Sequence, residues 1–200
     1  MSKFIVLEGI DGCGKTTQSK LLSRFLSSKG FEVVLTREPT DGEIGKLIKE
    51  KYLKEESSPL VDALLFSADR EEHLKKTVIP ALNQGKIVVS DRYYHSTLAY
   101  QSAQGVELEW LLNLNKNFIK PDLTLIIDVE AKKAMERIEC DERRDEKKKF
   151  EKVEFLEKVR RNFLRLKEIL RDENIVIVDG SKNEREVFEL VKREVEKLIL

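Results

Sequence analysis

Residues 9–16 read Gly-Ile-Asp-Gly-Cys-Gly-Lys-Thr, a spacing that suits the binding of a polyphosphate. Glycines let a backbone turn its N–H groups inward, so such a loop becomes a concave anion site at a helix N-terminus. Lys15 would reach the β- and γ-phosphates of a nucleotide, and the Thr16 hydroxyl would ligate Mg²⁺. The alternative is a glycine-rich turn without a ligand. We expect a nucleoside triphosphate to be bound by Gly9, Asp11, Gly12, Cys13, Gly14, Lys15, Thr16 and Thr17.

The segments around this loop have the pattern that the motif needs. Residues 3–8 form an apolar run typical of a buried parallel strand, and residues 18–28 have a helical pattern. Further apolar runs at 32–36, 86–89, 123–129 and 174–179 alternate with helical patterns. We therefore predict an α/β, three-layer fold, in which a five-stranded parallel sheet has helices on both faces. One domain is expected over residues 1–200.

Composition narrows the classes of partner. Lys plus Arg and Asp plus Glu each number 37, so the net charge is zero and nothing indicates a nucleic acid or a membrane as partner. No apolar run has transmembrane length, and the N-terminus lacks a signal-peptide pattern. Cys13 and Cys140 lie too far apart in sequence for a disulfide framework and are expected to be free thiols. We expect a cytoplasmic protein.

Charged residues follow two of the predicted strands at the edge where open α/β sheets bind ligands. Arg37 follows the second strand, and Asp91 and Arg92 follow the third. Arg92 would hold an acceptor phosphate in line with the triphosphate, and Asp91 would orient Mg²⁺. The alternatives are a salt bridge for Arg92, a helix N-cap for Asp91 and a surface ion pair for Arg37.

These features indicate a reaction class. The guanine-reading Asn-Lys-x-Asp pattern of switch GTPases is missing, since residues 115–118 read Asn-Lys-Asn-Phe. A chain of 200 residues also leaves little room for the transducing elements of a motor. The dense charge run at 141–149 is either a solvated loop or a lid whose cations close over the phosphates. A small kinase with a lid and a second substrate pocket fits best.

The chain resembles the thymidylate kinase (dTMP kinase) family from its first strand to its last helix. The phosphate loop is shared with many families and says little about the substrate. A narrower match is Asp-Arg-Tyr-Tyr-His-Ser-Thr-Leu-Ala-Tyr-Gln at 91–101, together with Leu-Phe-Ser-Ala-Asp-Arg at 65–70. Thr-Arg-Glu-Pro at 36–39 and Lys-Pro-Asp-Leu-Thr at 120–124 agree as well.

The resemblance implies roles for residues of the acceptor site. Phe66 would stack on thymine, Arg70 would donate to its O4 edge, and Tyr100 would lie against the sugar and disfavour a 2′-hydroxyl. Asp11 would face the acceptor near its sugar and phosphate, the alternative being an Asx turn. From the residues alone, Phe66 reads as a core residue and Tyr100 as a packed side chain. Arg37, Arg92, Ser96, Thr97 and Gln101 complete the expected substrate site, although Thr97 and Gln101 read equally well as exposed helix residues.

Gly12 stands where one branch of the family carries arginine. In the other branch, a lid arginine supplies that cation, which makes Arg143 and Arg144 the catalytic candidates beside Lys15, Asp91 and Arg92. The resemblance thus implies a P-loop kinase fold with a helical lid over residues 140–150 and a homodimer. The implied reaction is phosphorylation of dTMP by ATP with Mg²⁺, for dTTP synthesis. The alternatives are a kinase for another nucleoside monophosphate or deoxynucleoside, or a non-catalytic ATP-binding module.

Overall fold

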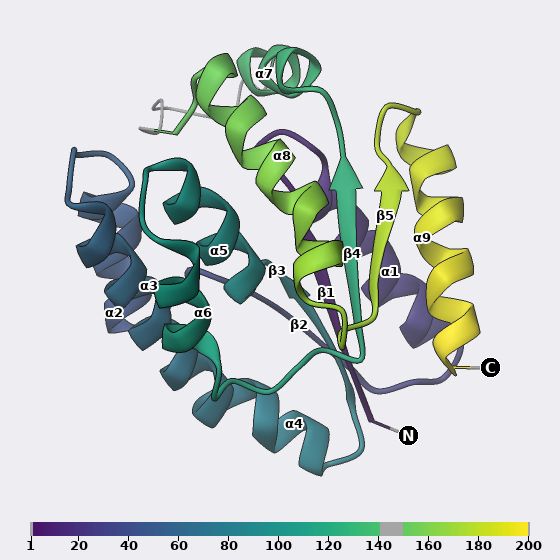
Figure 1. The fold of residues 1–200 in the computed structure, drawn as a ribbon. Helices are drawn as coiled ribbons and strands as arrows, with labels where there is room; N and C mark the ends of the chain where they lie inside the picture. Colours follow the sequence, from purple (N-terminus) through teal and green to yellow (C-terminus); the bar gives the residue numbers. More distant parts are fainter. Residues whose placement is uncertain (1, 141–149, 200) are drawn as a thin grey trace.

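A single parallel sheet organises the computed structural model, which describes residues 2–140 and 150–199 (Figure 1). Its strand order is β2-β3-β1-β4-β5, and every adjacent pair is parallel. The fold class predicted from the sequence is confirmed. The strands are β1 Lys3–Glu8, β2 Val33–Arg37, β3 Ile87–Asp91, β4 Leu123–Asp128 and β5 Ile175–Asp179.

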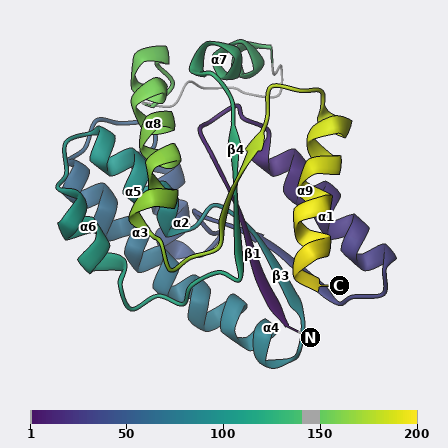
Figure 2. The same ribbon diagram turned by 45° about the vertical axis from the view of Figure 1, so that its right-hand side comes forward.

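Helices cover both faces of the sheet. α1 and α9 lie side by side on one face, and α3, α5 and α8 pack on the other (Figures 1 and 2). The central strands β1, β3 and β4 are therefore buried almost throughout, as their continuous apolar runs predict. The helices are α1 Lys15–Ser28, α2 Glu43–Leu47, α3 Pro59–His73, α4 Ile79–Asn83, α5 Tyr94–Ala103, α6 Leu108–Asn115, α7 Ala131–Glu139, α8 Val153–Ile169 and α9 Glu184–Ile199.

The helical stretch predicted over residues 60–84 is interrupted earlier than expected. A kink or end was expected at Pro80, but α3 gives way to a π-helical turn at Leu74–Val78 before α4 begins at Ile79. Proline lacks an N–H and clashes with the preceding turn. A wider turn just before it removes that clash, which accounts for the early interruption.

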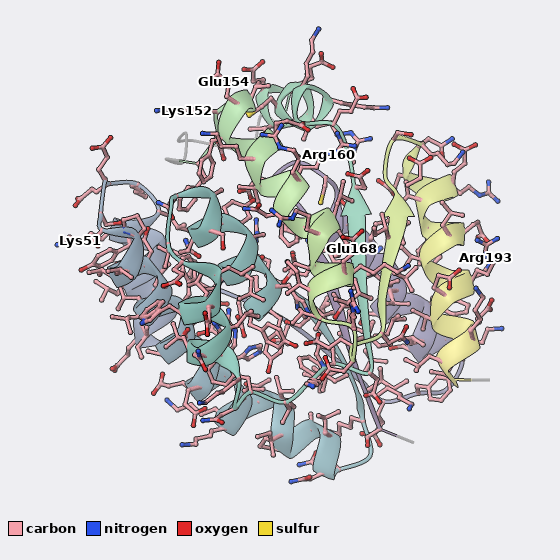
Figure 3. The ribbon with its side chains drawn as sticks, in the orientation of Figure 1. Lys51, Lys152, Glu154, Arg160, Glu168 and Arg193 are labelled. Atoms are coloured by element: carbon pink, nitrogen blue, oxygen red, sulfur yellow. The ribbon has the colours of Figure 1, made fainter. Side chains whose placement is uncertain are left out.

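The charge-rich composition is found on the outside of the helices. Lys152, Glu154, Glu168 and Arg193 project from α8, α9 and the residue before α8 into solvent (Figure 3). The described residues contain no helix that is both long and apolar enough to cross a membrane.

Two backbone hydrogen bonds fix the chain just beyond the strands. The amide of Glu38 donates to the Asp91 carbonyl over 3.1 Å, and the amide of Arg92 donates to the Leu7 carbonyl over 3.0 Å. The ends of β1, β2 and β3 are therefore held in one register. This edge of the sheet carries the site.

Candidate active site

A cleft of about 630 Å³ opens at the carboxyl edge of the sheet. Its walls come from the phosphate loop, the segments after β2, β3 and β5, and helices α3, α5 and α7. Residues far apart in sequence therefore meet in one place. The cleft is lined by the predicted residues Asp11, Gly12, Cys13, Gly14, Lys15, Thr16, Thr17, Arg37, Phe66, Arg70, Asp91, Arg92, Ser96, Thr97, Tyr100 and Gln101.

Gly9 does not line this cleft and serves packing. A Cβ at this residue would lie 2.6 Å from the Ile127 carbonyl oxygen. At Gly12, with φ +79°, a Cβ would lie only 2.3 Å from the Ala134 carbonyl oxygen. No arginine fits at position 12 in this arrangement, so a cation at this point has to come from another segment.

The lysine and threonine of the loop are already engaged. Lys15 is buried, and its Nζ donates to the Ile10 carbonyl over 2.9 Å. The Thr16 hydroxyl donates to Asp91 Oδ2 over 2.5 Å. Asp91 Oδ1 is buried and has no hydrogen-bond partner among the described residues. The N-cap alternative for Asp91 is wrong, because it ends β3 and the N-cap of α5 is Tyr93.

Arg92 lies between the phosphate loop and α5. Its Nη2 donates to Asp11 Oδ1 over 2.6 Å, and its Nη1 donates to Ser96 Oγ over 3.0 Å. Burial lowers the pKa of this guanidinium, but nearby Asp11, Tyr100, Asp91 and Glu8 raise it well above its ordinary value. Its φ of +79° is unusual for a residue with a side chain, and such strain gathers at functional sites. The guanidinium is thus a fixed positive charge at the cleft.

Tyr100 joins the same network from α5. Its hydroxyl donates to Asp11 Oδ2 over 2.9 Å and accepts from the Asp11 amide over 3.0 Å. Burial and the Asp11 charge raise the pKa of Tyr100 well above its ordinary value, so the hydroxyl stays protonated. The ring packs against Phe150 and Phe163, as the packing alternative predicts, while it also lines the cleft.

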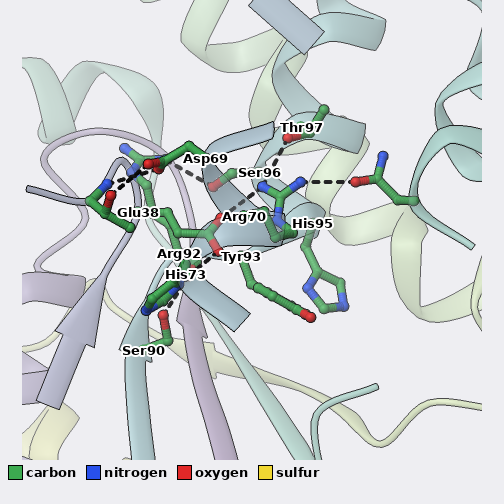
Figure 4. Close-up of polar contacts among 12 residues, drawn as sticks. Glu38, Asp69, Arg70, His73, Ser90, Arg92, Tyr93, His95, Ser96 and Thr97 are labelled. Carbon is green, nitrogen blue, oxygen red and sulfur yellow. Dashed lines mark hydrogen bonds and ion pairs between the residues drawn. The ribbon is translucent and has the colours of Figure 1, made fainter. Parts of the chain in front are cut away.

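Phe66 and Arg70 lie one turn apart on α3. Phe66 is half-buried against the core and faces the cleft, which is compatible with both interpretations given above. Arg70 is only 1% exposed, and its Nε donates to Glu38 Oε2 over 2.9 Å (Figure 4). The suggestion that Thr97 and Gln101 are exposed is wrong, since both are buried.

The remaining predicted residues have less direct support from the structure. The Arg37 side chain is 58% exposed and contacts Asp41 over 3.2 Å, as its ion-pair alternative predicts. Its acceptor-phosphate role stays a prediction. Arg143 and Arg144 lie outside the described residues, as does most of the expected lid. Cys13 is buried, and burial raises the pKa of its thiol, which favours the neutral form.

Two residues of the site were missed by sequence reasoning. Arg137 on α7 lines the cleft, and its guanidinium donates to the carbonyls of Gly180 over 3.0 Å and Cys13 over 3.4 Å. Glu8 ends β1, fully buried, and accepts from the Tyr93 amide over 2.7 Å and the Ser96 hydroxyl over 2.6 Å. A carboxylate inside an otherwise apolar strand was a usable signal for Glu8, whereas nothing local distinguishes Arg137.

Comparisons with known proteins agree with this geometry. A family model described as thymidylate kinase matches residues 7–191. A probable thymidylate kinase of Thermococcus gammatolerans is 44% identical over 207 aligned residues, which cover 98% of each chain. The corresponding figures are 46% and 96% of each chain for a probable thymidylate kinase of Pyrococcus horikoshii. A third, from Staphylothermus marinus, is 42% identical over 98% of this chain and 94% of its own. The chain belongs to the thymidylate kinase family.

Proposed function

We propose that this protein transfers the γ-phosphoryl group of ATP to the phosphate of dTMP, which gives ADP and dTDP. Family membership supports the reaction, and one structural observation supports its location in this cleft. The charged Arg92 guanidinium is hydrogen-bonded to the phosphate loop at Asp11, in a cleft that Phe66 and Arg70 also line. A donor phosphate and an acceptor phosphate would therefore meet beside the same cation.

The chemistry requires positioning and neutralisation of charge more than proton transfer. The acceptor phosphate is already ionised near neutral pH, so no general base is needed. Lys15 would exchange its hydrogen bond to the Ile10 carbonyl for the β- and γ-phosphates. Arg92 would hold the acceptor oxygen in line and stabilise the charge of the moving phosphoryl group. Arg137, and Arg143 or Arg144 of the expected lid, are the candidates for further positive charge.

The residues at the loop suit Mg²⁺. Thr16 Oγ1 and Asp91 Oδ2 are adjacent, and the buried Asp91 Oδ1 has no partner among the described residues. Mg²⁺ prefers oxygen ligands and binds through one or two carboxylates, substrate phosphates and water. Such a site does not require three or more metal-binding side chains. The described residues contain no cluster of that kind. Thr16 and Asp91 would hold the ion, which would supply positive charge beside the triphosphate.

The acceptor base and sugar would lie along α3 and α5. Phe66 would stack on the thymine ring, and Arg70 would donate to its O4. Thr97 and Gln101, buried beside the cleft, would complete the polar edge of that pocket. Tyr100, held by Asp11, would leave no room for a 2′-hydroxyl.

The protein is also proposed to form a homodimer. The apolar side chains of Leu60, Val61 and Leu64 share one side of α3 and are 49%, 38% and 50% exposed. A second copy covering this stripe would remove it from water. Sedimentation of the wild type and of Leu64→Glu tests this, because the variant should sediment as a monomer. A wild-type monomer would contradict the proposal.

An assay of ADP release tests the reaction. ATP and Mg²⁺ are supplied with dTMP, dUMP, dCMP, dAMP, dGMP or thymidine, one at a time. dTMP should give the largest kcat/KM, and Arg70→Ala should raise the KM for dTMP far more than the KM for ATP. A preference for another acceptor would move the assignment to that nucleotide, and ADP release that ignores every acceptor would exclude a kinase.

A further inference from the structure

A buried chain of polar side chains leads from β2 to Arg70. The Thr36 hydroxyl lies 2.7 Å from His73 Nε2, and His73 Nδ1 lies 3.0 Å from Glu38 Oε1. The other oxygen of the same carboxylate, Oε2, accepts from Arg70 Nε over 2.9 Å (Figure 4). Glu38, His73 and Arg70 are 4%, 3% and 1% exposed, so water does not screen these contacts.

The direction of each hydrogen bond follows from the chemistry of the groups. The Glu38 carboxylate facing a guanidinium only accepts, so His73 Nδ1 carries a hydrogen. In the neutral imidazole, Nε2 then accepts, and the hydrogen comes from the Thr36 hydroxyl. Both oxygens of Glu38 are thereby occupied, one by His73 and one by Arg70. The carboxylate has a single orientation in which both partners are satisfied.

The far side of the guanidinium is held as well. Arg70 Nη1 donates to Asn115 Oδ1 over 2.8 Å, and Nη2 donates to Thr97 Oγ1 over 3.2 Å. The rings of Tyr93 and Phe118 lie 5.4 and 5.6 Å from the guanidinium carbon. Arg70 Nη2 also lies 2.8 Å from Glu38 Oε2. Within the described part of the chain, both N–H groups of Nη2 therefore face protein acceptors, and one N–H group of Nη1 is left for a ligand in the cleft.

We propose that His73 is a positioning residue for base recognition: through Glu38 it fixes the plane of the Arg70 guanidinium, and so selects pyrimidine nucleotides with a carbonyl at C4. This inference rests on the proposed function, in which Arg70 reads the acceptor base. Thymine and uracil present O4 as an acceptor there, whereas cytosine presents an amino donor. If His73 releases Glu38, the carboxylate turns and the guanidinium loses its alignment with O4.

Two substitutions of His73 distinguish the loss of its hydrogen bond to Glu38 from a mere change in side-chain size. In His73→Asn, the amide nitrogen takes the place of Nδ1 and keeps a donor for Glu38. In His73→Gln, the amide group takes the place of Nε2, which keeps the contact with Thr36 but loses the donor to Glu38. Both variants are polar and uncharged. They therefore differ mainly in the one hydrogen bond at issue.

The assay measures KM and kcat for dTMP and dUMP, the inhibition constant of dCMP, and the KM for ATP. We expect His73→Gln to raise the KM for dTMP and dUMP together by about tenfold, the effect of one lost hydrogen bond. Binding of dCMP and of ATP should stay within about twofold, because neither uses the O4 contact. His73→Asn should restore the KM for dTMP to within about threefold of the wild type.

Equal KM values for dTMP in the Gln and Asn variants would overturn the inference, as would a parallel loss of ATP or dCMP binding. If His73→Gln does not fold, Thr36→Val decides, since it removes the hydroxyl that orients the imidazole. It should raise the KM for dTMP roughly threefold and leave ATP unchanged. An unchanged KM would overturn the inference. A wild type that phosphorylates other acceptors and not dTMP overturns the proposed function first, and is recognised without any variant.

Discussion

Replacing Arg92 by lysine tests whether its guanidinium takes part in phosphoryl transfer or only stabilises the fold. Arginine donates here to two separate acceptors, Asp11 Oδ1 at 2.6 Å and Ser96 Oγ at 3.0 Å. An ammonium group keeps the positive charge but is a compact point that does not span both acceptors. The backbone at φ +79° disfavours both side chains alike, so its strain cancels in the comparison.

Two magnitudes separate the interpretations. Losing one neutral hydrogen bond to Ser96 while the ion pair with Asp11 persists costs about 1 kcal/mol of stability. Losing a fixed donor aimed at charge that develops in the transition state costs about 3–4 kcal/mol, or roughly 10²- to 10³-fold in kcat. We therefore expect Arg92→Lys to fold nearly as stably as the wild type and to lose most of its kcat.

Steady-state ADP release and urea unfolding on the same samples measure both quantities. Arg193→Lys on α9 is the matched control, because that side chain is 66% exposed and does not line the cleft, and it should change neither quantity. A kcat of Arg92→Lys within about fivefold of the wild type, together with a loss of about 3 kcal/mol or more in stability, would refute the catalytic role. Arg92 would then be a structural ion-pair residue.

Three further predictions concern the loop and the buried strand end. Lys15→Met should abolish transfer, by roughly 10³-fold or more, and keep cooperative unfolding, since its loss removes the cation at the phosphates; activity above that level would contradict its role. Gly12→Ala should destabilise the fold by about 2 kcal/mol or more in urea, because its Cβ would meet the Ala134 carbonyl at 2.3 Å. Gly30→Ala, with φ +89° and nothing within 4 Å, is the control and should cost about 1 kcal/mol, the strain alone. Burial raises the pKa of Glu8 above its ordinary value of 4.5, so the stability that this group contributes is present below pH 4.5 and is lost as pH rises through the raised value. Unfolding free energy measured against pH should therefore fall less steeply in Glu8→Gln, and identical slopes would contradict this prediction.

The sheet and the phosphate loop could be predicted because their signals are local. Buried parallel strands are continuous apolar runs, and the loop glycines, Lys15 and Thr16 lie within eight residues of one another. An interruption of the helix at residues 60–84 was predicted correctly, but its position was wrong. It was expected at Pro80 and lies at Leu74–Val78, because proline affects the turn that precedes it.

The side-chain networks could not be predicted in the same way. Arg70 contacts Asn115, 45 positions away, and that contact depends on how α3 and α6 pack. Arg137 reaches the loop only because α7 packs over Gly12, where a Cβ would meet the Ala134 backbone. The spacing of these residues in the sequence does not indicate that they are in contact. For the same reason, the sequence did not distinguish a substrate contact from an exposed position for Thr97 and Gln101. The structure shows that both are buried on α5.

The central claim is that two nucleotides bind end to end in one cleft, with Arg92 beside the phosphates that meet. The most direct measurement is the dissociation constant of a single molecule in which thymidine and adenosine are joined through five phosphates. Occupation of both subsites at once predicts binding at least ~10²-fold tighter than that of ATP, together with competition against both ATP and dTMP. Binding no tighter than that of ATP, or competition against ATP alone, would contradict the claim.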